Sequence, residues 1–292
     1  MASRILVPTD GSDAATAALD HALDIAADRG LTVHLLSVAD TNQPSITRLG
    51  TEVVDALELE GAEIVSDAAE RADERGVSSV KDVAQGDPRD VITEYASGDE
   101  FDRVAMGTHG RRGLGEYVLG NVTDHVVNRS DVPVLTVRAA EDARTTYPYE
   151  TVLVPTDGSD HATAALEEAA AVAADCGATL HLLSVVDELP EVLDTGSAAL
   201  SEAVEENVQA VLDEAAATAR EAGVDDVTTT IESGPVARKI TAVADSTGAD
   251  LIVMGTHGHT GLDRHLLGSF TERVMRTAPV PVLTTRLADD RD

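Results

Sequence analysis

The chain has 292 residues, 43% of them hydrophobic, a length and composition typical of two folded domains and not of a disordered chain. Its 53 Asp and Glu against 21 Lys and Arg give a net charge of −32, which would repel nucleic-acid phosphates and argues against nucleic-acid binding. No apolar run approaches the ~20 residues of a membrane span and no signal peptide is evident, so we expect a cytoplasmic protein without a membrane segment.

Strand-like and helix-like segments alternate from the N-terminus onward. The β-branched run Arg4–Pro8 predicts a strand. Ser12 or Asp13 can cap the helix that follows, which has apolar residues at i, i+3 and i+4 spacing and ends at Gly30. The next predicted elements are a strand at 31–38, a helix at roughly 50–75, a strand at 79–85, a helix at 87–97, a strand at 101–106, a helix at 117–129 and a strand at 132–137.

The second half of the chain repeats this order. It predicts strands at 151–156, 179–185, 225–233, 250–255 and 280–285, and helices at 160–176, 197–222, 235–246 and 265–277. Strands that alternate with helices favour right-handed crossovers and a parallel sheet covered on both faces. Each half is therefore predicted to be an α/β domain with an open five-stranded parallel sheet.

An internal repeat supports this division. The heptapeptide VPTDGSD occurs at 7–13 and again at 154–160, and MGTHG at 106–110 returns at 254–258. The offset of 147 or 148 residues exceeds the period of about 20–50 residues that solenoid repeats show, so each copy is a domain. We predict domain 1 at 1–138, a linker at 139–149 and domain 2 at 150–287.

Two segments of each copy are candidates for a ligand site. Sheets of this class bind ligands at the carboxyl ends of strands where the strand order reverses, and the turn after strand 1 and the Gly-rich loop after strand 4 should meet there. Glycine N–H groups beside a helix N-terminus suit phosphates, although a Gly-rich loop can also be only a tight connection. The carboxylates of Asp10 and Asp157 can accept ribose hydroxyls, or can serve only as turn or cap residues.

Other chemistries lack support in the sequence. A Gly-x4-Gly-Lys-[Ser/Thr] motif is absent, and so is Gly-x-Gly-x-x-Gly after strand 1. Of the loop histidines His257, His259 and His265, only His257 recurs in copy one, as His109, which favours packing over metal binding. Cys176 has no counterpart. We predict no catalytic residue and no metal site.

On these motifs the chain resembles a tandem universal stress protein of the UspA type, with two Rossmann-like domains of the adenine nucleotide α-hydrolase-like fold. ATP-binding members carry Gly-x2-Gly-x9-Gly-[Ser/Thr] after strand 4. Copy two matches it in full, with Gly268-Ser269 at its end, whereas copy one has Asn121 after Gly120. The resemblance implies binding of ATP or another adenine nucleotide, with Mg²⁺ held only through the phosphates, and a regulatory, non-enzymatic stress-response role.

The resemblance also implies roles for residues. The strand-1 aspartates would lie at the adenine and ribose, Val38 and Val185 against the base, and the glycine backbone and Ser269 at the phosphates. The expected ligand-site residues are Pro8, Thr9, Asp10, Val38, Met106, Gly107, His109, Gly110, Gly120, Asn121 and Val122 in copy one, and Pro155, Thr156, Asp157, Val185, Met254, Gly255, His257, Gly258, Gly268, Ser269 and Phe270 in copy two.

Asn121 places its donor differently from a serine hydroxyl, so if only one copy binds nucleotide we expect it to be copy two. The positive charges of Arg111 and Arg112 could offset this difference electrostatically. Members of the family pair through their last strands, which predicts an intramolecular pseudo-dimer of the two domains and leaves homo-oligomers open. Two alternatives remain: an interaction module of the same fold that binds no nucleotide, and a small-molecule enzyme on the same scaffold.

The composition carries one further expectation. The basic residues are 19 Arg and 2 Lys, and aromatic residues make up 2% of the chain. An acid surplus of this size destabilises a compact fold unless salt screens it, and at molar salt the Debye length is ~3 Å. We therefore expect the salt-rich cytoplasm of a halophile, with an ordinary acidic bacterial protein as the alternative.

Overall fold

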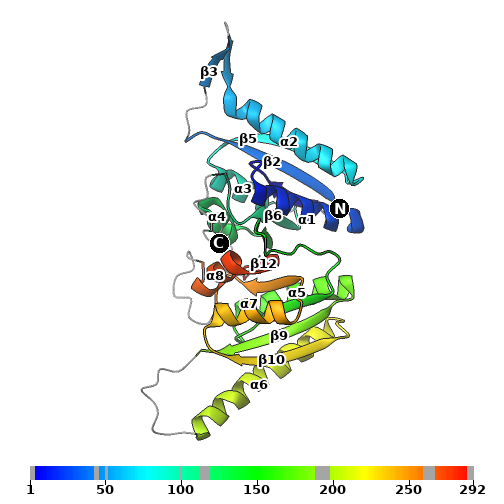
Figure 1. The fold of residues 1–292 in the computed structure, drawn as a ribbon, viewed down its shortest axis with the longest axis vertical. Helices are drawn as coiled ribbons and strands as arrows, with labels where there is room; N and C mark the ends of the chain where they lie inside the picture. Colours follow the sequence, from blue (N-terminus) through cyan, green and yellow to red (C-terminus); the bar gives the residue numbers. More distant parts are fainter. Residues whose placement is uncertain are drawn as a thin grey trace. The chain divides into compact units, whose positions relative to one another are not determined.

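The computed structural model describes residues 4–42, 46–49, 52–98, 100–111, 119–187, 198–258 and 267–287. The chain divides into two compact units, Met1–Tyr147 and Pro148–Asp292. Each unit contains a parallel sheet with its own set of helices (Figure 1).

Unit 1 has a five-stranded parallel sheet in the order β7-β6-β1-β2-β5. A separate antiparallel pair, β3 with β4, precedes the second helix. The strands are β1 (Arg4–Pro8), β2 (Thr32–Asp40), β3 (Ile46–Leu49), β4 (Glu52–Asp55), β5 (Ser79–Gly86), β6 (Arg103–Gly107) and β7 (Val134–Val137), and the helices are α1 (Asp13–Arg29), α2 (Ala56–Glu74), α3 (Pro88–Ala96) and α4 (Asn121–Arg129).

Unit 2 repeats the architecture with the sheet order β10-β9-β8-β11-β12, again all parallel. Its strands are β8 (Thr151–Pro155), β9 (Thr179–Val186), β10 (Val227–Ser233), β11 (Leu251–Gly255) and β12 (Val282–Thr285), and its helices are α5 (Asp160–Cys176), α6 (Ala198–Glu221), α7 (Val236–Ser246) and α8 (Ser269–Thr277).

Helices cover both faces of each sheet. In unit 1, α1 packs beside α2, and α3 beside α4. The chain moves outward from β1 to β2 and β5, then crosses to β6 and β7, so right-handed crossovers place α1 and α2 on one face and α3 and α4 on the other. Unit 2 pairs α5 with α6 and α7 with α8 in the same way. The predicted α/β fold is confirmed.

The core of each unit depends on small side chains in the first helix. Ala14, Ala18 and Ala22 of α1 are fully buried against the sheet, where the strands contribute Leu6 and Val104. Alanine permits close helix–sheet packing, which compensates for the scarcity of large aromatic side chains. Ser12 caps α1 by accepting from Ala15 N–H, as the sequence predicts.

Three predicted helix starts are wrong. The helix expected from about residue 50 begins at Ala56, because β3 and β4 come first. The helices expected from 117 and 265 begin at Asn121 and Ser269, and residues 117–118 and 265–266 lie outside the described residues. Gly120 and Gly268 have non-helical backbone and act as the N-caps of α4 and α8, so neither glycine belongs to the helix that was predicted to include it.

None of the helices in the described ranges combines the length and the apolar character that crossing a bilayer requires.

Candidate ligand sites at the strand ends

The carboxyl end of β1 is the point where the strand order of unit 1 reverses, with β2 on one side and β6 on the other. The last residue of β1, Pro8, pairs with Leu36, and β2 continues to Asp40, so the half-buried Val38 lies beyond the end of β1. Val185 holds the same position in unit 2, because Pro155 pairs with Leu183. A crevice at this point is where open α/β sheets bind ligands.

The turn after β1 is closed by its own side chains. Thr9 N–H donates to the carbonyl of Leu36 at 2.8 Å, and the Thr9 hydroxyl accepts from Gly11 N–H at 3.2 Å. One carboxylate oxygen of Asp10 accepts from Ser12 N–H at 3.0 Å. Gly11 has a φ of 72°, which favours glycine.

Unit 2 reproduces this turn bond for bond. Thr156 N–H donates to Leu183 at 2.8 Å, the Thr156 hydroxyl accepts from Gly158 N–H at 3.2 Å, and Asp157 accepts from Ser159 N–H at 3.0 Å. Both turns hold their aspartate at the end of the first strand.

The Gly-rich loop meets this turn in both units. Arg111 N–H donates to the second carboxylate oxygen of Asp10 at 2.9 Å. A Cβ on Gly110 would lie 2.5 Å from that oxygen, and one on Gly258 would lie 2.8 Å from the Asp157 carboxylate. The structure therefore brings together the two segments that the sequence places at one strand edge. Each carboxylate oxygen of Asp10 retains lone-pair capacity for a further donor.

The first glycine of each loop permits close packing of strand and helix. A Cβ on Gly107 would lie 2.6 Å from the backbone carbonyl carbon of Ala14, and one on Gly255 would lie 2.8 Å from the carbonyl oxygen of His161. The preceding Met106 and Met254 are buried. Two glycines and two methionines that were expected in the ligand site therefore make packing contacts in the protein core.

The last glycine of each loop leads into a helix that points its N-terminus at the crevice. Gly120 N–H donates to the carbonyl of Thr108 at 2.8 Å, and Gly268 N–H to that of Thr256 at 2.9 Å. Neither glycine has a side chain to cap the helix, and no side-chain cap is present at α4 or α8. The first-turn N–H groups of both helices are thus available to an anion.

The residues that open these helices are accessible. Asn121 and Ser269, the first residues of α4 and α8, are exposed. Val122 is half-buried, and the matching Phe270 is 40% exposed.

Each described loop histidine contacts the threonine that precedes it. His109 Nδ1 lies 3.2 Å from the Thr108 hydroxyl, and His257 Nδ1 lies 3.1 Å from the Thr256 hydroxyl. His257 is also buried against the ring of His161, with 5.3 Å between ring centroids. In the described part of the chain no three His, Cys, Asp or Glu side chains form a group that could hold a metal ion. His259, His265, Arg112 and Thr260 lie outside that part.

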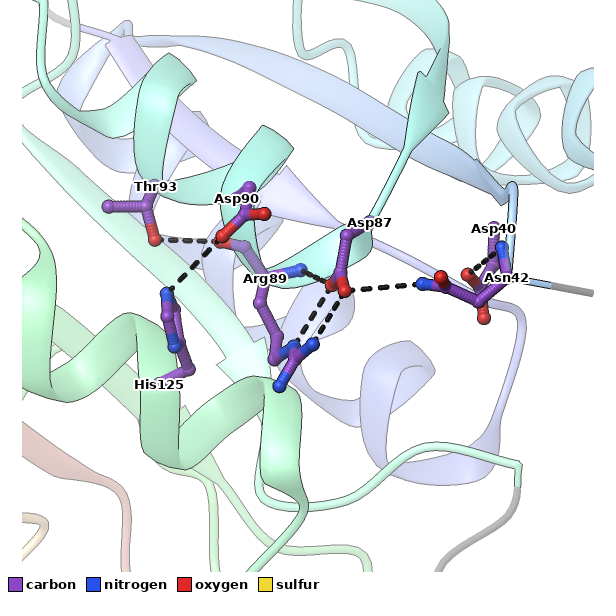
Figure 2. Close-up of polar contacts among 7 residues, drawn as sticks. All are labelled: Asp40, Asn42, Asp87, Arg89, Asp90, Thr93 and His125. Atoms are coloured by element: carbon purple, nitrogen blue, oxygen red, sulfur yellow. Dashed lines mark hydrogen bonds and ion pairs between the residues drawn. The ribbon is translucent and has the colours of Figure 1, made fainter.

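Unit 1 carries a polar cluster beside its site that the sequence analysis missed (Figure 2). Asp87 caps α3 by accepting from Arg89 N–H at 3.0 Å, and its carboxylate also binds the Arg89 guanidinium at 2.6 and 3.0 Å. Asn42, just past β2, donates to the same carboxylate at 3.2 Å. The Arg89 guanidinium holds the pKa of Asp87 well below its usual range. The cluster joins the end of β2 to the start of α3.

The same cluster reaches α4 through a weaker contact. His125 Nε2 lies 3.8 Å from the Asp90 carboxylate, and partial burial lowers the pKa of His125. Unit 2 has Pro235, Ala237 and Arg273 in the places of Asp87, Arg89 and His125. An Asp-Pro pair at a predicted helix start is the one local signal of this cluster in the sequence.

A second ion pair ties the Gly-rich loop of unit 1 to another element. The Arg111 guanidinium contacts the Glu60 carboxylate of α2, and it also lies over Gly11. Both side chains are about half exposed, so the pair adds little stability but keeps one positive charge beside the site.

Known proteins resemble each of the two units. The sequence model of the universal stress protein family matches residues 1–138 and 148–286. The universal stress protein MJ0531 of Methanocaldococcus jannaschii is 39% identical over 140 residues, which make up 46% of this chain and 81% of that protein. The universal stress protein Mb2028c of Mycobacterium bovis is 29% identical over 234 residues, 78% of each chain.

A universal stress protein from Archaeoglobus fulgidus has a similar crystal structure. The TM-score is 0.69 at 27% sequence identity, and the alignment covers 98% of this chain and 97% of that one.

Proposed function

The chain belongs to the universal stress protein family, and from that premise we propose that its two units bind ATP or another adenine nucleotide in a regulatory stress-response role. Each site would lie at the carboxyl ends of the first and fourth strands of the parallel sheet. The first-turn N–H groups of α4 and α8 would bind phosphate oxygens, and the residues beyond β1 and β8 would contact the base and ribose.

One observation carries this proposal. Both α4 and α8 follow an N-cap glycine that has no side-chain cap, and the loop before each helix approaches the strand-1 aspartate, with a backbone hydrogen bond from Arg111 to Asp10 in unit 1 and close contact of Gly258 with Asp157 in unit 2. Uncapped N–H groups at a helix N-terminus favour an anion, whereas the neighbouring carboxylate favours a hydroxyl donor. A ligand with a phosphate at one end and a sugar hydroxyl at the other satisfies both.

Val38 and Val185 fit the base end of such a ligand. Each is half-buried and lies past the end of the neighbouring strand, where an apolar side chain can contact the face of a flat ring. Mg²⁺ would be held through the phosphates alone. Because no protein side chain would then fix the metal for catalysis, we propose a nucleotide-binding role and not an ATPase role.

The two sites would differ in their phosphate contacts. Ser269 offers a hydroxyl as the first residue of α8, whereas Asn121 offers a longer amide in α4. Arg111 adds a positive charge beside the site of unit 1 but is shared with Glu60. We expect the tighter site in unit 2.

Calorimetric titration of the full chain with ATP and Mg²⁺ in high potassium chloride tests the proposal, after release of any nucleotide bound during purification. The matched variants are Asn121→Asp and Ser269→Asp. A carboxylate at the first position of a helix is favourable for the helix but repels a phosphate. Each variant should therefore keep its fold and lose one ATP equivalent. No binding to the unmodified chain at millimolar ATP would overturn the proposal.

A second candidate is an interaction module that binds no nucleotide. It is favoured by the hydrogen bonds of Asp10, whose two oxygens already accept from Ser12 and Arg111 N–H, so the residue has a structural role without a ligand. Under this alternative Asn121→Asp and Ser269→Asp would leave the calorimetric trace with ATP flat, as in the unmodified chain.

The acidic composition supports a cytoplasm rich in salt as the setting of this function. A net charge of −32 on 292 residues imposes self-repulsion that molar potassium chloride would screen. The unfolding temperature should therefore rise as potassium chloride increases from about 0.1 M to about 2 M. A flat or falling dependence would favour an ordinary acidic protein.

A further inference from the structure

The two sites differ next to the valine at the base end. In unit 2, Val185 of β9 pairs in register with Glu232 of β10, and in unit 1 the matching Val38 of β2 pairs with Ala84 of β5. Paired residues of neighbouring parallel strands lie about 4.8 Å apart and point to the same face of the sheet. A carboxylate therefore stands beside Val185 where a methyl group stands beside Val38.

Helix α7 adds a positive charge at the same place. Lys239 Nζ donates to Glu232 Oε2 at 2.8 Å, which fixes both side chains on the α7 face of the sheet. Gly86 ends β5 and Gly234 directly follows β10, and aligning these two glycines places Lys239 at the position of Val91 of α3. Lys239 is one of only 2 lysines beside 19 arginines in the chain.

The pair is partly withdrawn from water yet keeps bonding capacity. The side chains of Lys239 and Glu232 are 36% and 34% exposed. Among the described residues only Glu232 Oε2 is engaged, so Oε1 can accept a further donor and the ammonium has two further N–H groups. Ala84 and Val91, both half-buried, offer no such groups.

We propose that Glu232 and Lys239 are specificity-determining residues that read the hydrogen-bonding edge of the base in unit 2, whereas the matching positions of unit 1, Ala84 and Val91, offer only apolar groups. This inference rests on the proposed nucleotide binding. Glu232 Oε1 accepts from the exocyclic amine of adenine, and Lys239 donates to a ring nitrogen on the same edge. A site built to bond such an amine disfavours an analogue that lacks it.

The experiment compares ATP with the triphosphate of purine riboside, which lacks the 6-amino group. Each unit is measured in the full chain, with the other silenced by Asn121→Asp or Ser269→Asp. We expect unit 2 to prefer ATP by about tenfold or more, and unit 1 by less than about threefold.

A reciprocal exchange of the pair gives the matched controls. The double variant Glu232→Ala with Lys239→Val installs the residues of unit 1 and should reduce the preference of unit 2 to that of unit 1. The double variant Ala84→Glu with Val91→Lys should raise the preference of unit 1. Glu232→Gln retains an acceptor oxygen and should keep most of the preference. Circular dichroism confirms that each variant is folded.

The possible failures are distinguishable. If ATP binds but the two units prefer it equally, or if the exchange leaves the preference of unit 2 unchanged, the inference on Glu232 and Lys239 is wrong while nucleotide binding stands. If neither unit binds ATP, the proposed function is wrong and this inference falls with it.

Discussion

The backbone N–H of Arg111 donates to the carboxylate of Asp10 at 2.9 Å, across 101 residues of sequence. The other oxygen of Asp10 accepts from Ser12 N–H at 3.0 Å, inside the turn after β1. A single side chain thus closes the turn and anchors the Gly-rich loop. The residue that would bind a ribose hydroxyl is also the residue that holds the two halves of the site together.

Replacing Asp10 by Asn should destabilise unit 1 without any ligand present. Asparagine has one acceptor oxygen, so its amide N–H₂ would face a backbone donor, and the loss of a charge-assisted hydrogen bond costs about 1–3 kcal/mol. Urea unfolding of the nucleotide-free chain measures this, with the exposed Asp13→Asn as the control. An unchanged free energy of unfolding together with weaker ATP binding would instead make Asp10 a ligand residue only.

Replacing Gly107 by Ala should destabilise unit 1 through overpacking. The new Cβ would lie 2.6 Å from the Ala14 carbonyl carbon, and because this neighbour is backbone, α1 must move away from the sheet. Overpacking of this kind costs about 1–3 kcal/mol. The control is Gly98→Ala, whose Cβ would meet nothing closer than 3.9 Å at an ordinary φ. Equal melting temperatures for the two variants would contradict the packing role of Gly107.

The Gly120 and Gly268 positions differ from Gly107 in what a side chain would meet. Their φ angles are −69° and −56°, which any residue can adopt, so backbone strain does not require glycine there. A Cβ on Gly268 would instead lie 2.9 Å from the carbonyl of Thr256, and one on Gly120 would lie 3.3 Å from His109 Cα. A side chain at either position would disturb the fold as well as any bound ligand, so a loss of binding would have two explanations. Asn121→Asp and Ser269→Asp add a charge without this steric clash and therefore test ligand binding more directly.

The strands of the two parallel sheets and both ends of α1 could be predicted from sequence because their signals are local. Ser12 caps α1 and Gly30 ends it in the left-handed region at a φ of 65°, each through contacts within one turn of the helix. The convergence of Asp10 with Gly110 follows from parallel topology, since the carboxyl ends of β1 and β6 share an edge. The same motifs occur in both halves of the chain, so each prediction has support from two copies.

What the sequence could not predict depends on contacts between distant segments. The bond from Asn42 to Asp87 joins residues 45 apart, and the ion pair of Arg111 with Glu60 joins residues 51 apart. The pair β3–β4 replaced the first turns of a predicted helix, because a short alternating run reads equally as either structure. The sequence places Gly120 in the first turn of a helix predicted from residue 117, whereas its extended backbone makes it the N-cap.

His21 should make unit 1 sensitive to acid. It is 1% exposed, and burial lowers its pKa from 6.5 to about 4. Above pH 6.5 the residue is neutral in both states, whereas between pH 6.5 and 4 the unfolded chain takes up a proton that the folded chain does not. Folding therefore loses stability as the pH falls through this window, by about 3 kcal/mol in all.

The variant His21→Leu tests this through the pH dependence of the free energy of unfolding. Free energies of unfolding measured from pH 7.5 to 4.5 should fall less steeply in the variant than in the unmodified chain, whatever the difference at neutral pH. Unit 2 has Glu168 at the matching position, so a buried histidine at this place is a feature of unit 1. Parallel slopes for the variant and the unmodified chain would show that His21 does not control acid stability.

Tyr95 should ionise at a higher pH than an ordinary tyrosine. Its hydroxyl donates to the Asp82 carboxylate at 2.6 Å, and this bond to a negative charge raises its pKa from 10.0 to about 12. The raised pKa means that the stability from this bond is present below pH 10 and is lost as the pH rises toward 12.

Ultraviolet titration of the phenolate follows this ionisation directly. Asp82→Asn keeps an acceptor oxygen but removes the charge, so the late-titrating tyrosine should move toward pH 10, and Tyr95→Phe should remove that step altogether. Tyr95→Phe should also cost about 0.5–1.5 kcal/mol at neutral pH, because a hydrogen bond is lost while the ring keeps its edge contact with His34. If Tyr95→Phe leaves the phenolate titration between pH 10 and 12 unchanged, Asp82 does not hold the Tyr95 proton in solution.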